Sequence, residues 1–363
     1  MKTRKNNINK KKISKKVGGK PIDGIDSFFN KIYNISVTNI NSSICKFDLG
    51  KIVYDITLIK ELRGGKSGDK VSLIKCKDKN YILKVFKKGN KDKSLKDDNE
   101  IKYHKIFMNL FRNFTPCPIL HLSGTFNRIP FSESDEVVNS KYVIMEALSP
   151  PYELNNFIET KCDGKEDKLY PDLDIKNVVI QILYIISKML GKNLFHCDMH
   201  TGNIMIVPNE HKISLDFSHV GSDYKFEIGS HLVKIIDFGE GAKSVLLGDS
   251  FKSCRLNRTT SSVLQNLDSK CKGISILRSY TKLLTEQVFD AKGSIDINFF
   301  VTILKIIAIF DKRFKKIDFI KLQVISEKME TTNPSFTKKQ QNELRLVRHK
   351  QGVINVLNEL TKI

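Results

Sequence analysis

The chain has 363 residues, enough for a sizeable core in two domains or in one two-lobed unit. Its balance of 40% hydrophobic and 28% charged residues is that of a globular protein, and its most apolar run, 299–310, is too short to span a bilayer. Lysine and arginine number 61 against 40 acidic residues, a formal net charge of +21 that suits polyanionic ligands or acidic protein segments.

The first twenty residues carry nine lysine or arginine side chains and no acidic one. Such a block repels itself and buries nothing, so we predict a basic disordered arm over residues 1–22. An N-terminal extension without a clear motif follows over 23–52. A solvated tail is the plain interpretation of the arm, while contact of residues 1–20 with nucleic acid or an acidic partner, or a nuclear-import signal, stays open.

The seven cysteines are scattered, odd in number and never spaced C-x-x-C. This pattern argues against a disulfide framework or a zinc site and favours a reducing compartment. No signal peptide or transmembrane segment is expected, because the charged N-terminus is not followed by a long apolar stretch. We therefore expect an intracellular, cytoplasmic protein, with the nucleus as an alternative.

Short strand-like runs separated by turn-forming residues dominate the chain as far as residue 148. A single helix is expected among them, from Asn99 to Leu110, because Tyr103, Ile106 and Phe107 share one face. The expected strands cover 54–62, 70–76, 81–86, 119–126 and 142–146. They predict a small antiparallel layer carrying one helix.

Beyond residue 150 the apolar spacing becomes helical. Helices are expected over 178–190, 276–288, 298–310 and 338–360, and a hairpin over 213–228 that turns at Gly221. A β-rich front and an α-rich back predict an α+β fold of two lobes, with ligands binding between them.

Two motifs carry the chemistry, each after an apolar, strand-like run. His196, Asp198 and Asn203 form H-x-D-x-x-x-x-N, and Asp237 begins D-F-G. The first carboxylate could accept the proton of a substrate hydroxyl, and the amide with the second carboxylate could hold magnesium on a triphosphate.

With these motifs the chain resembles the protein kinase superfamily, as a divergent serine/threonine kinase similar to haspin-like kinases and to those of large DNA viruses. The resemblance implies a two-lobed fold with a small β-rich N-lobe over 53–148 and a mainly α-helical C-lobe over 149–363. It also implies ATP and Mg²⁺ as cofactors, Asp198 as the catalytic base, and Asn203 and Asp237 as metal ligands. A viral source would place the protein in the host cell or the virion.

A glycine-rich segment between the first two expected strands is similar to the kinase loop that covers the phosphates. It is irregular, since Arg63 stands in place of the first glycine, and by itself it fits a plain hairpin turn better. Its position upstream of the next motif favours the kinase loop instead. The residues that the resemblance places around the nucleotide here are Leu62, Gly64, Gly65, Gly68 and Val71.

Lys84 is a cation inside an apolar strand, which is costly unless the ammonium is paired or reaches water at a sheet edge. The resemblance implies an ion pair with Glu100 on the following helix, in which the lysine aligns the α- and β-phosphates. Asp97 and Asp98 are rival partners. Residues 143–148 resemble the strand that leads into the hinge, where the backbone of Glu146 and Leu148 would bind the adenine edge.

The metal-binding aspartate has two candidates. Asp216 follows Asn203 at the spacing common in kinases, whereas Asp237 has the complete D-F-G sequence. We favour Asp237, because the intervening segment can form an inserted hairpin within 208–231, as in haspin-like kinases. Asp216 would then be a surface strand residue.

Two residues of the catalytic stretch depart from the common kinase pattern. Cys197 replaces the arginine that reads a phosphorylated activation loop, and His200 replaces a lysine. The pattern D-x-H-x-G-N occurs in protein kinases and in small-molecule phosphotransferases, so it leaves the substrate open.

The leading interpretation is an ATP-dependent protein serine/threonine kinase, which transfers the γ-phosphoryl group to a protein hydroxyl. Its partner would be a protein substrate, which the positive charge of the chain would suit if it carries acidic segments. The alternatives are a small-molecule phosphotransferase on the same fold, a catalytically inactive scaffold, and a nucleic-acid-binding protein without enzymatic activity.

Overall fold

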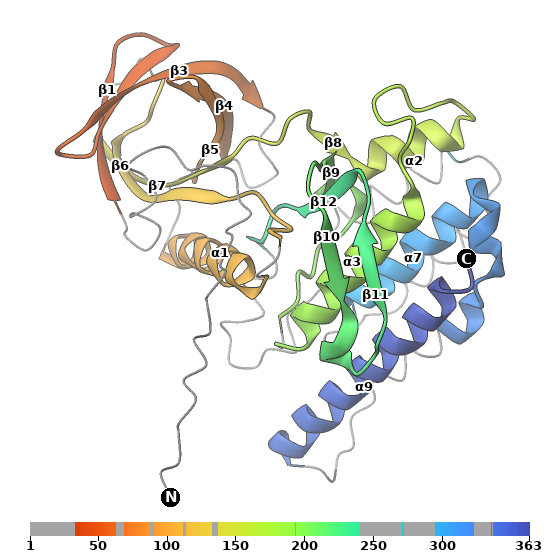
Figure 1. Cartoon of the computed structure of the whole chain (residues 1–363). Helices are drawn as coiled ribbons and strands as arrows, with labels where there is room; N and C mark the ends of the chain where they lie inside the picture. The colour runs from red at the N-terminus through yellow and green to blue at the C-terminus, as the bar shows by residue number, and fades with distance from the viewer. Residues whose placement is uncertain are drawn as a thin grey trace, which may run out of the picture.

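The computed structural model describes residues 33–62, 69–87, 91–111, 114–132, 137–192, 194–239, 271, 295–322, 335 and 337–363. The expected basic arm over 1–22, the glycines Gly64, Gly65 and Gly68, and the expected helix over 276–288 lie outside these residues. The domain boundaries at 53–148 and 149–363 stay predictions. Within the described residues the chain has mixed α/β content, with a strand-rich N-terminal part and a largely helical remainder (Figure 1).

The strands of the N-terminal part close into a barrel in the order β1-β2-β3-β4-β5-β7-β6 (Figure 1). Their bounds are β1 Tyr33–Asn39, β2 Ile44–Asp48, β3 Val53–Leu62, β4 Lys70–Cys76, β5 Lys79–Val85, β6 Leu120–Arg128 and β7 Val137–Glu146. Alternate residues of each strand point inward, so the barrel interior is filled by apolar side chains such as Phe47, Leu83 and Phe126.

The closed barrel differs from the open antiparallel layer that we expected. The segment 23–52, to which no element was assigned, supplies β1 and β2. Strand β1 pairs antiparallel with β2 on one side and parallel with β6 on the other, which closes the sheet. Its Ile35 and Val37 are buried in the barrel. Closure leaves the sheet without the exposed edges that would otherwise invite further pairing.

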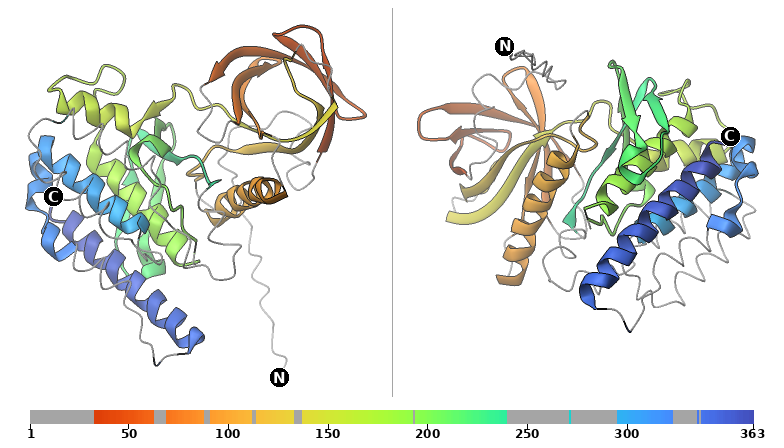
Figure 2. Two further views of the ribbon diagram at one scale, coloured as in Figure 1. Left: turned by 180° about the vertical axis from the view of Figure 1, so that it is seen from behind. Right: turned by 60° about the horizontal axis from the view of Figure 1, so that its bottom comes forward.

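The helix α1 (Lys91–Leu110) lies between the barrel and the helical part, as the views of Figures 1 and 2 agree. It begins in the charged segment that we expected to be a connector before residue 99. Its Tyr103 and Phe107 are buried in the same hydrophobic core as the helices of the C-terminal part, not inside the barrel. Through these side chains α1 packs against the C-terminal part, and through Ile101 it packs against apolar side chains of the barrel.

The C-terminal part is built around α3 (Ile175–Leu190), which is buried along nearly its whole length. The other described α-helices in this part are α2 (Leu154–Cys162), α7 (Ile295–Phe310) and α9 (Lys338–Leu360). A small sheet in the order β12-β9-β8 joins β12 (His231–Ile235), β9 (Ile204–Pro208) and β8 (Tyr152–Glu153). The hairpin expected over 213–228 is present as β10 (Ile213–Asp216) and β11 (Lys225–Ile228).

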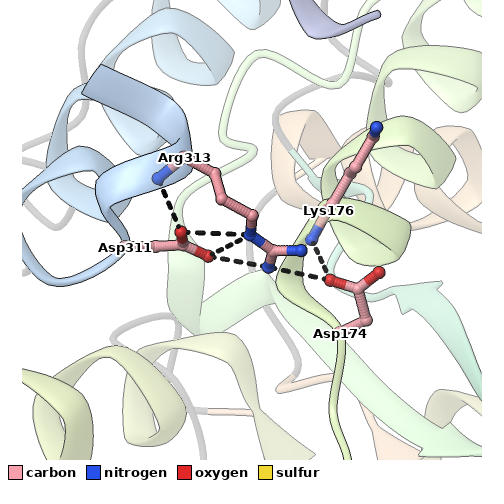
Figure 3. Close-up of polar contacts among 4 residues, drawn as sticks. All are labelled: Asp174, Lys176, Asp311 and Arg313. Carbon is pink, nitrogen blue, oxygen red and sulfur yellow. Dashed lines mark hydrogen bonds and ion pairs between the residues drawn. The ribbon is translucent and has the colours of Figure 1, made fainter. Parts of the chain in front are cut away.

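A polar clasp ties the region after α7 to the start of α3 (Figure 3). Arg313 lies in the short 3₁₀ helix η4 (Lys312–Lys316) and donates through Nη2 to Asp311, at 2.8 Å, and to Asp174, at 3.0 Å. Asp174 is also the N-cap of α3, since its carboxylate accepts the backbone N–H of Lys176. Because the arginine is about half exposed, we assign this clasp a stabilisation of at most about 1 kcal/mol.

One expectation about the cysteines is wrong. Cys162, at the end of α2, forms a disulfide with Cys271, 109 residues further along the chain, with a Cα–Cα distance of 4.8 Å. The number and spacing of the cysteines did not indicate this pairing. The fold brings the two cysteines together although they are far apart in the sequence. Separately, none of the helices in the described part of the chain is long and apolar enough to cross a membrane.

Candidate active site

A row of four residues crosses the outer face of the barrel toward α1. Leu62 on β3 lies opposite Val71 on β4, Val71 lies opposite Lys84 on β5, and Lys84 lies opposite Val143 on β7. Because directly opposed residues share one face of a sheet, Lys84 stands among apolar neighbours on the face away from the barrel core. Two of the residues predicted to surround a nucleotide, Leu62 and Val71, are thus brought beside it.

Lys84 forms a short ion pair with Glu100 of α1. Its Nζ lies 2.6 Å from Glu100 Oε1, and both side chains are 15% exposed. Burial lowers the pKa of Lys84, but the carboxylates of Glu100, Asp237 and Asp69 outweigh it, so the pKa lies above its ordinary value and the ammonium is charged at neutral pH. The pairing implied by the family resemblance is therefore present.

Asp98, one of the two rival carboxylates, has another partner, and an unforeseen carboxylate lies close to Lys84. Asp98 pairs with Lys141 at 2.6 Å. Asp69, which directly precedes β4, places Oδ2 3.8 Å from Lys84 Nζ with its own side chain only 4% exposed. No local pattern points to Asp69, because its approach to Lys84 depends on the register of β4 against β5.

The predicted catalytic loop, residues 196–203, is held in place by a buried carboxylate from a distant helix. Asp296, in the first turn of α7, accepts the backbone N–H of His196 at 2.7 Å and that of Cys197 at 2.9 Å. Burial raises the pKa of Asp296, while His196 and the two N–H groups oppose the shift. Cys197 has a φ of +63°, a conformation rare for a residue with a side chain, and the two hydrogen bonds help to hold it there.

Asp198, Asn203 and His200 lie together at the end of this loop. Asn203 donates through Nδ2 to the carbonyl oxygen of Asp198 at 2.9 Å, which leaves its Oδ1 as the acceptor end of the amide. His200 accepts the N–H of Gly202 through Nδ1, so the proton of the neutral ring is on Nε2, 4.0 Å from the Asp198 carboxylate. Burial lowers the pKa of His200, although the Asp198 carboxylate opposes that shift.

Asp237 is joined to the catalytic loop through the backbone. Ile236 donates its N–H to the carbonyl oxygen of Asn203 at 3.0 Å. Asp237 itself has a φ of +60° and an exposed side chain. A side chain at Gly239 would place its Cβ 3.2 Å from Glu100 Oε2, so the glycine lets the Glu100 carboxylate lie against this turn. The geometry thus brings Asp237 to the group of Lys84 and Glu100.

Asp216, the other candidate for the metal ligand, has a different role. It ends β10 and caps the 3₁₀ helix η3 (Phe217–Val220) by accepting the N–H of Ser218. This hydrogen bond lowers its pKa. Its carboxylate thus bonds the local turn of the inserted hairpin, where the sequence analysis expected only a surface strand residue.

The side chain of Phe238 joins α1 to the catalytic loop. Its ring centroid lies 4.7 Å from that of His104, 4.8 Å from Phe107 and 5.3 Å from His196. The first two are residues of α1 and the third belongs to the catalytic loop. These aromatic contacts of Phe238 hold the turn that carries Asp237 against the helix that carries Glu100.

The chain leaves the barrel at Glu146, the last residue of β7. Its backbone N–H donates to the carbonyl oxygen of Ile119, so its carbonyl oxygen is the group that it can offer to an adenine edge. Its carboxylate accepts from Ile119 N at 3.0 Å and from Lys234 Nζ at 3.2 Å. Leu148 follows, half-buried, in the connection to β8.

Sequence reasoning missed three charged residues of this site: Asp69, Lys234 and Asp296. A usable signal existed for two of them. Lys234 is a lysine inside an apolar strand, and Asp296 is an acid at the start of a very apolar helix, so each needed a buried partner. The partners, Glu146 and His196, are too distant in sequence to be identified without the fold.

The residues present fit a magnesium ion held jointly with phosphate. Among the described residues no cluster of three or more His, Cys, Asp or Glu side chains could hold a metal by itself. Magnesium at phosphate-transfer sites is bound by one or two protein oxygens together with phosphate oxygens and water. Asn203 Oδ1 and the exposed Asp237 carboxylate offer such a partial set.

No protein-family model matches the chain, and no curated protein matches it in sequence. Similar solved structures include two double mutants of the PknI kinase domain of Mycobacterium tuberculosis. One aligns with a TM-score of 0.37 at 12% identity, over 82% of this chain and 95% of that domain. The other has a TM-score of 0.35 at 13% identity, over 82% and 96%. This likeness is weak and concerns fold alone, so function is inferred below from the residues of the site.

Proposed function

We propose that the protein is an ATP-dependent phosphotransferase that transfers the γ-phosphoryl group to a serine or threonine hydroxyl of a protein. The observation that carries the proposal is the convergence of five residues from four separate parts of the chain. Lys84 and Glu100 form a buried ion pair, Asp198 and Asn203 share one loop, and Asp237 is bonded to that loop through its neighbour. These are the groups that phosphoryl transfer requires.

Each side chain has a distinct role in this proposal. The Lys84 ammonium, oriented by Glu100, binds phosphate oxygens of the nucleotide. The Asp198 carboxylate orients the acceptor hydroxyl and accepts its proton as the oxygen attacks phosphorus. His200, neutral with its proton on Nε2, can donate a hydrogen bond to the transferring phosphoryl group without competing for the proton that Asp198 accepts.

Two groups complete the nucleotide site. The apolar side chains of Leu62 and Val71 would contact the adenine ring, and the backbone of Glu146 and Leu148 would bind its edge. Magnesium, held by Asn203 and Asp237, would neutralise charge on the phosphates. The glycines Gly64, Gly65 and Gly68 complete the proposed site outside the described residues.

A protein acceptor is favoured over a small molecule by charge. The chain carries a formal +21, which would attract an acidic protein segment. The competing proposal, a small-molecule phosphotransferase, is supported by the His200-Thr201-Gly202 sequence, where His200 caps the 3₁₀ helix η2 (Thr201–Asn203). The two proposals share every catalytic residue and differ only in the acceptor.

Transfer of radiolabel from [γ-³²P]ATP with magnesium tests the proposal. Acceptors would be the chain itself, acidic and basic carrier proteins, and aminoglycosides and choline. Wild type would be compared with Asp198→Asn, Asp237→Asn and the matched control Asp216→Asn. We expect label on protein serine or threonine that the first two variants lose and the control keeps. Label only on the small molecules would establish the competing proposal, and absence of transfer despite ATP binding would point to an inactive scaffold.

A further inference from the structure

Asp69 places a carboxylate beside Lys84, and the proposed reaction gives this carboxylate no role. Strand alternation places it on the same face of β4 as Val71, and Val71 lies directly opposite Lys84 on β5. Asp69 is therefore a diagonal neighbour of Lys84 on the face that carries the nucleotide-binding row. It also follows Gly68 directly, at the end of the glycine-rich segment.

Two contacts of the Asp69 carboxylate concern Lys84 and the end of β5. Oδ1 accepts the backbone N–H of Lys87 at 3.0 Å, and Oδ2 faces Lys84 Nζ at 3.8 Å. The first contact is structural, because it fixes the chain where it leaves β5. The second is electrostatic, and it gives the ammonium of Lys84 a second carboxylate besides Glu100. A side chain that is only 4% exposed is poorly screened by water.

We propose that Asp69 is a positioning residue that holds Lys84 when no phosphate is bound and weakens the binding of anionic nucleotides. The inference rests on the proposed function, since it assumes that Lys84 binds phosphate. A phosphate that approaches Lys84 meets the negative charge of Asp69 at the same place. Glu100 would remain the partner of Lys84 in the nucleotide complex, and the repulsion from Asp69 would favour release of the diphosphate product.

Electrostatic and structural roles differ in three measurable ways. A charge effect weakens ATP and ADP but leaves uncharged adenosine untouched. It decreases as salt screens the charges. It is also removed by Asp69→Asn, which keeps a side-chain oxygen for the Lys87 N–H, so the fold is retained. A purely structural role would instead respond to the loss of that hydrogen bond and not to the charge of the ligand.

Binding of ATP, ADP and adenosine to the full chain would be measured by isothermal titration calorimetry at low and at high salt. Wild type would be compared with Asp69→Asn and with Glu61→Gln, which removes an equal charge from the exposed side of neighbouring β3. We expect Asp69→Asn to bind ATP and ADP about tenfold more tightly at low salt, by an effect that shrinks at high salt. Adenosine affinity should be unchanged, as should every affinity of Glu61→Gln.

Three outcomes would overturn the inference. Equal or weaker ATP binding by Asp69→Asn, in a chain whose wild type binds ATP, would show that Asp69 does not oppose the phosphates. An equal gain for adenosine would show a packing effect instead of a charge effect. Absence of ATP binding by the wild type would overturn the proposed function together with this inference, so the two failures are distinct.

Discussion

The hydroxyl of Tyr103 donates a hydrogen bond to the carbonyl oxygen of Phe195, 2.8 Å away. Tyr103 lies on α1, three residues after Glu100, and Phe195 directly precedes the catalytic loop. Both side chains are fully buried in the core of the C-terminal part. Glu100, the partner of Lys84, therefore lies on a helix that is bonded to the start of the catalytic loop, whereas Lys84 itself lies on a strand of the barrel.

The first prediction concerns this hydrogen bond. Tyr103→Phe leaves the buried carbonyl of Phe195 without its donor, which should lower the free energy of unfolding by about 1–3 kcal/mol. Because α1 is then held less firmly, we also expect a several-fold lower kcat. Urea denaturation and steady-state kinetics would measure both. Tyr54→Phe, the same change at a half-buried tyrosine of β3, is the control, and equal effects in the two variants would contradict the prediction.

The second prediction concerns the buried carboxylate of Asp296. Asp296→Asn keeps one acceptor oxygen but sets an NH₂ group against one of the two backbone N–H groups, those of His196 and Cys197. We expect a loss of about 1–3 kcal/mol of stability, and a lower kcat because Asp198 follows these residues directly. Thermal unfolding and kinetics measure the two effects. The exposed Asp223→Asn serves as the control, and wild-type turnover in Asp296→Asn would refute the role assigned to this carboxylate.

Local patterns predicted the elements whose signals lie within one segment. The expected strand 70–76 and helix 338–360 coincide with β4 and α9, and strong helical spacing identified α3. The strands β1 and β2 were missed although Ile35, Val37, Cys45 and Phe47 alternate with polar residues. Each run is short, and its assignment depends on pairing with β3 and β6, which the sequence does not display.

The same distinction applies to the site. Lys84, Asp198, Asn203 and Asp237 were identifiable because each stands in a recognisable local context. Asp69 and Asp296 act across 15 and 100 residues of chain, so only strand register and helix packing reveal them. For the proposed metal ligand, the more typical spacing belongs to Asp216, which lies at the end of β10 in the inserted hairpin.

The third prediction is a pH dependence of stability. His104 is buried against Phe238 and bonds the carbonyl oxygen of Pro118 at 2.8 Å. Burial lowers its pKa to about 4, whereas a histidine in the unfolded chain titrates near about 6.5. As the pH falls from about 6.5 to 4, the unfolded chain binds a proton that the folded chain does not. The free energy of unfolding should therefore fall by up to about 1.4 kcal/mol per pH unit from this residue.

His104→Gln isolates this contribution. Glutamine can still donate to the Pro118 carbonyl but does not titrate, so the variant should lose less stability than wild type between pH 6.5 and 4.5. Above pH 6.5 the two should change in parallel. Urea denaturation at a series of pH values makes the comparison. His219 also has a pKa lowered to about 4, so a residual pH dependence in His104→Gln is expected, and only an undiminished slope would contradict the prediction.

The fourth prediction concerns the disulfide between Cys162 and Cys271. Peptide mapping of protein that has been alkylated without reduction should recover the two cysteines as one linked peptide, which a reductant separates. Because the link closes a long stretch of chain, removing it with Cys162→Ser should lower stability by roughly 2–4 kcal/mol. Cys45→Ser, at a buried free cysteine of the barrel, should leave the linked peptide in place. Complete alkylation of both Cys162 and Cys271 before reduction would show that this bond does not form in the protein.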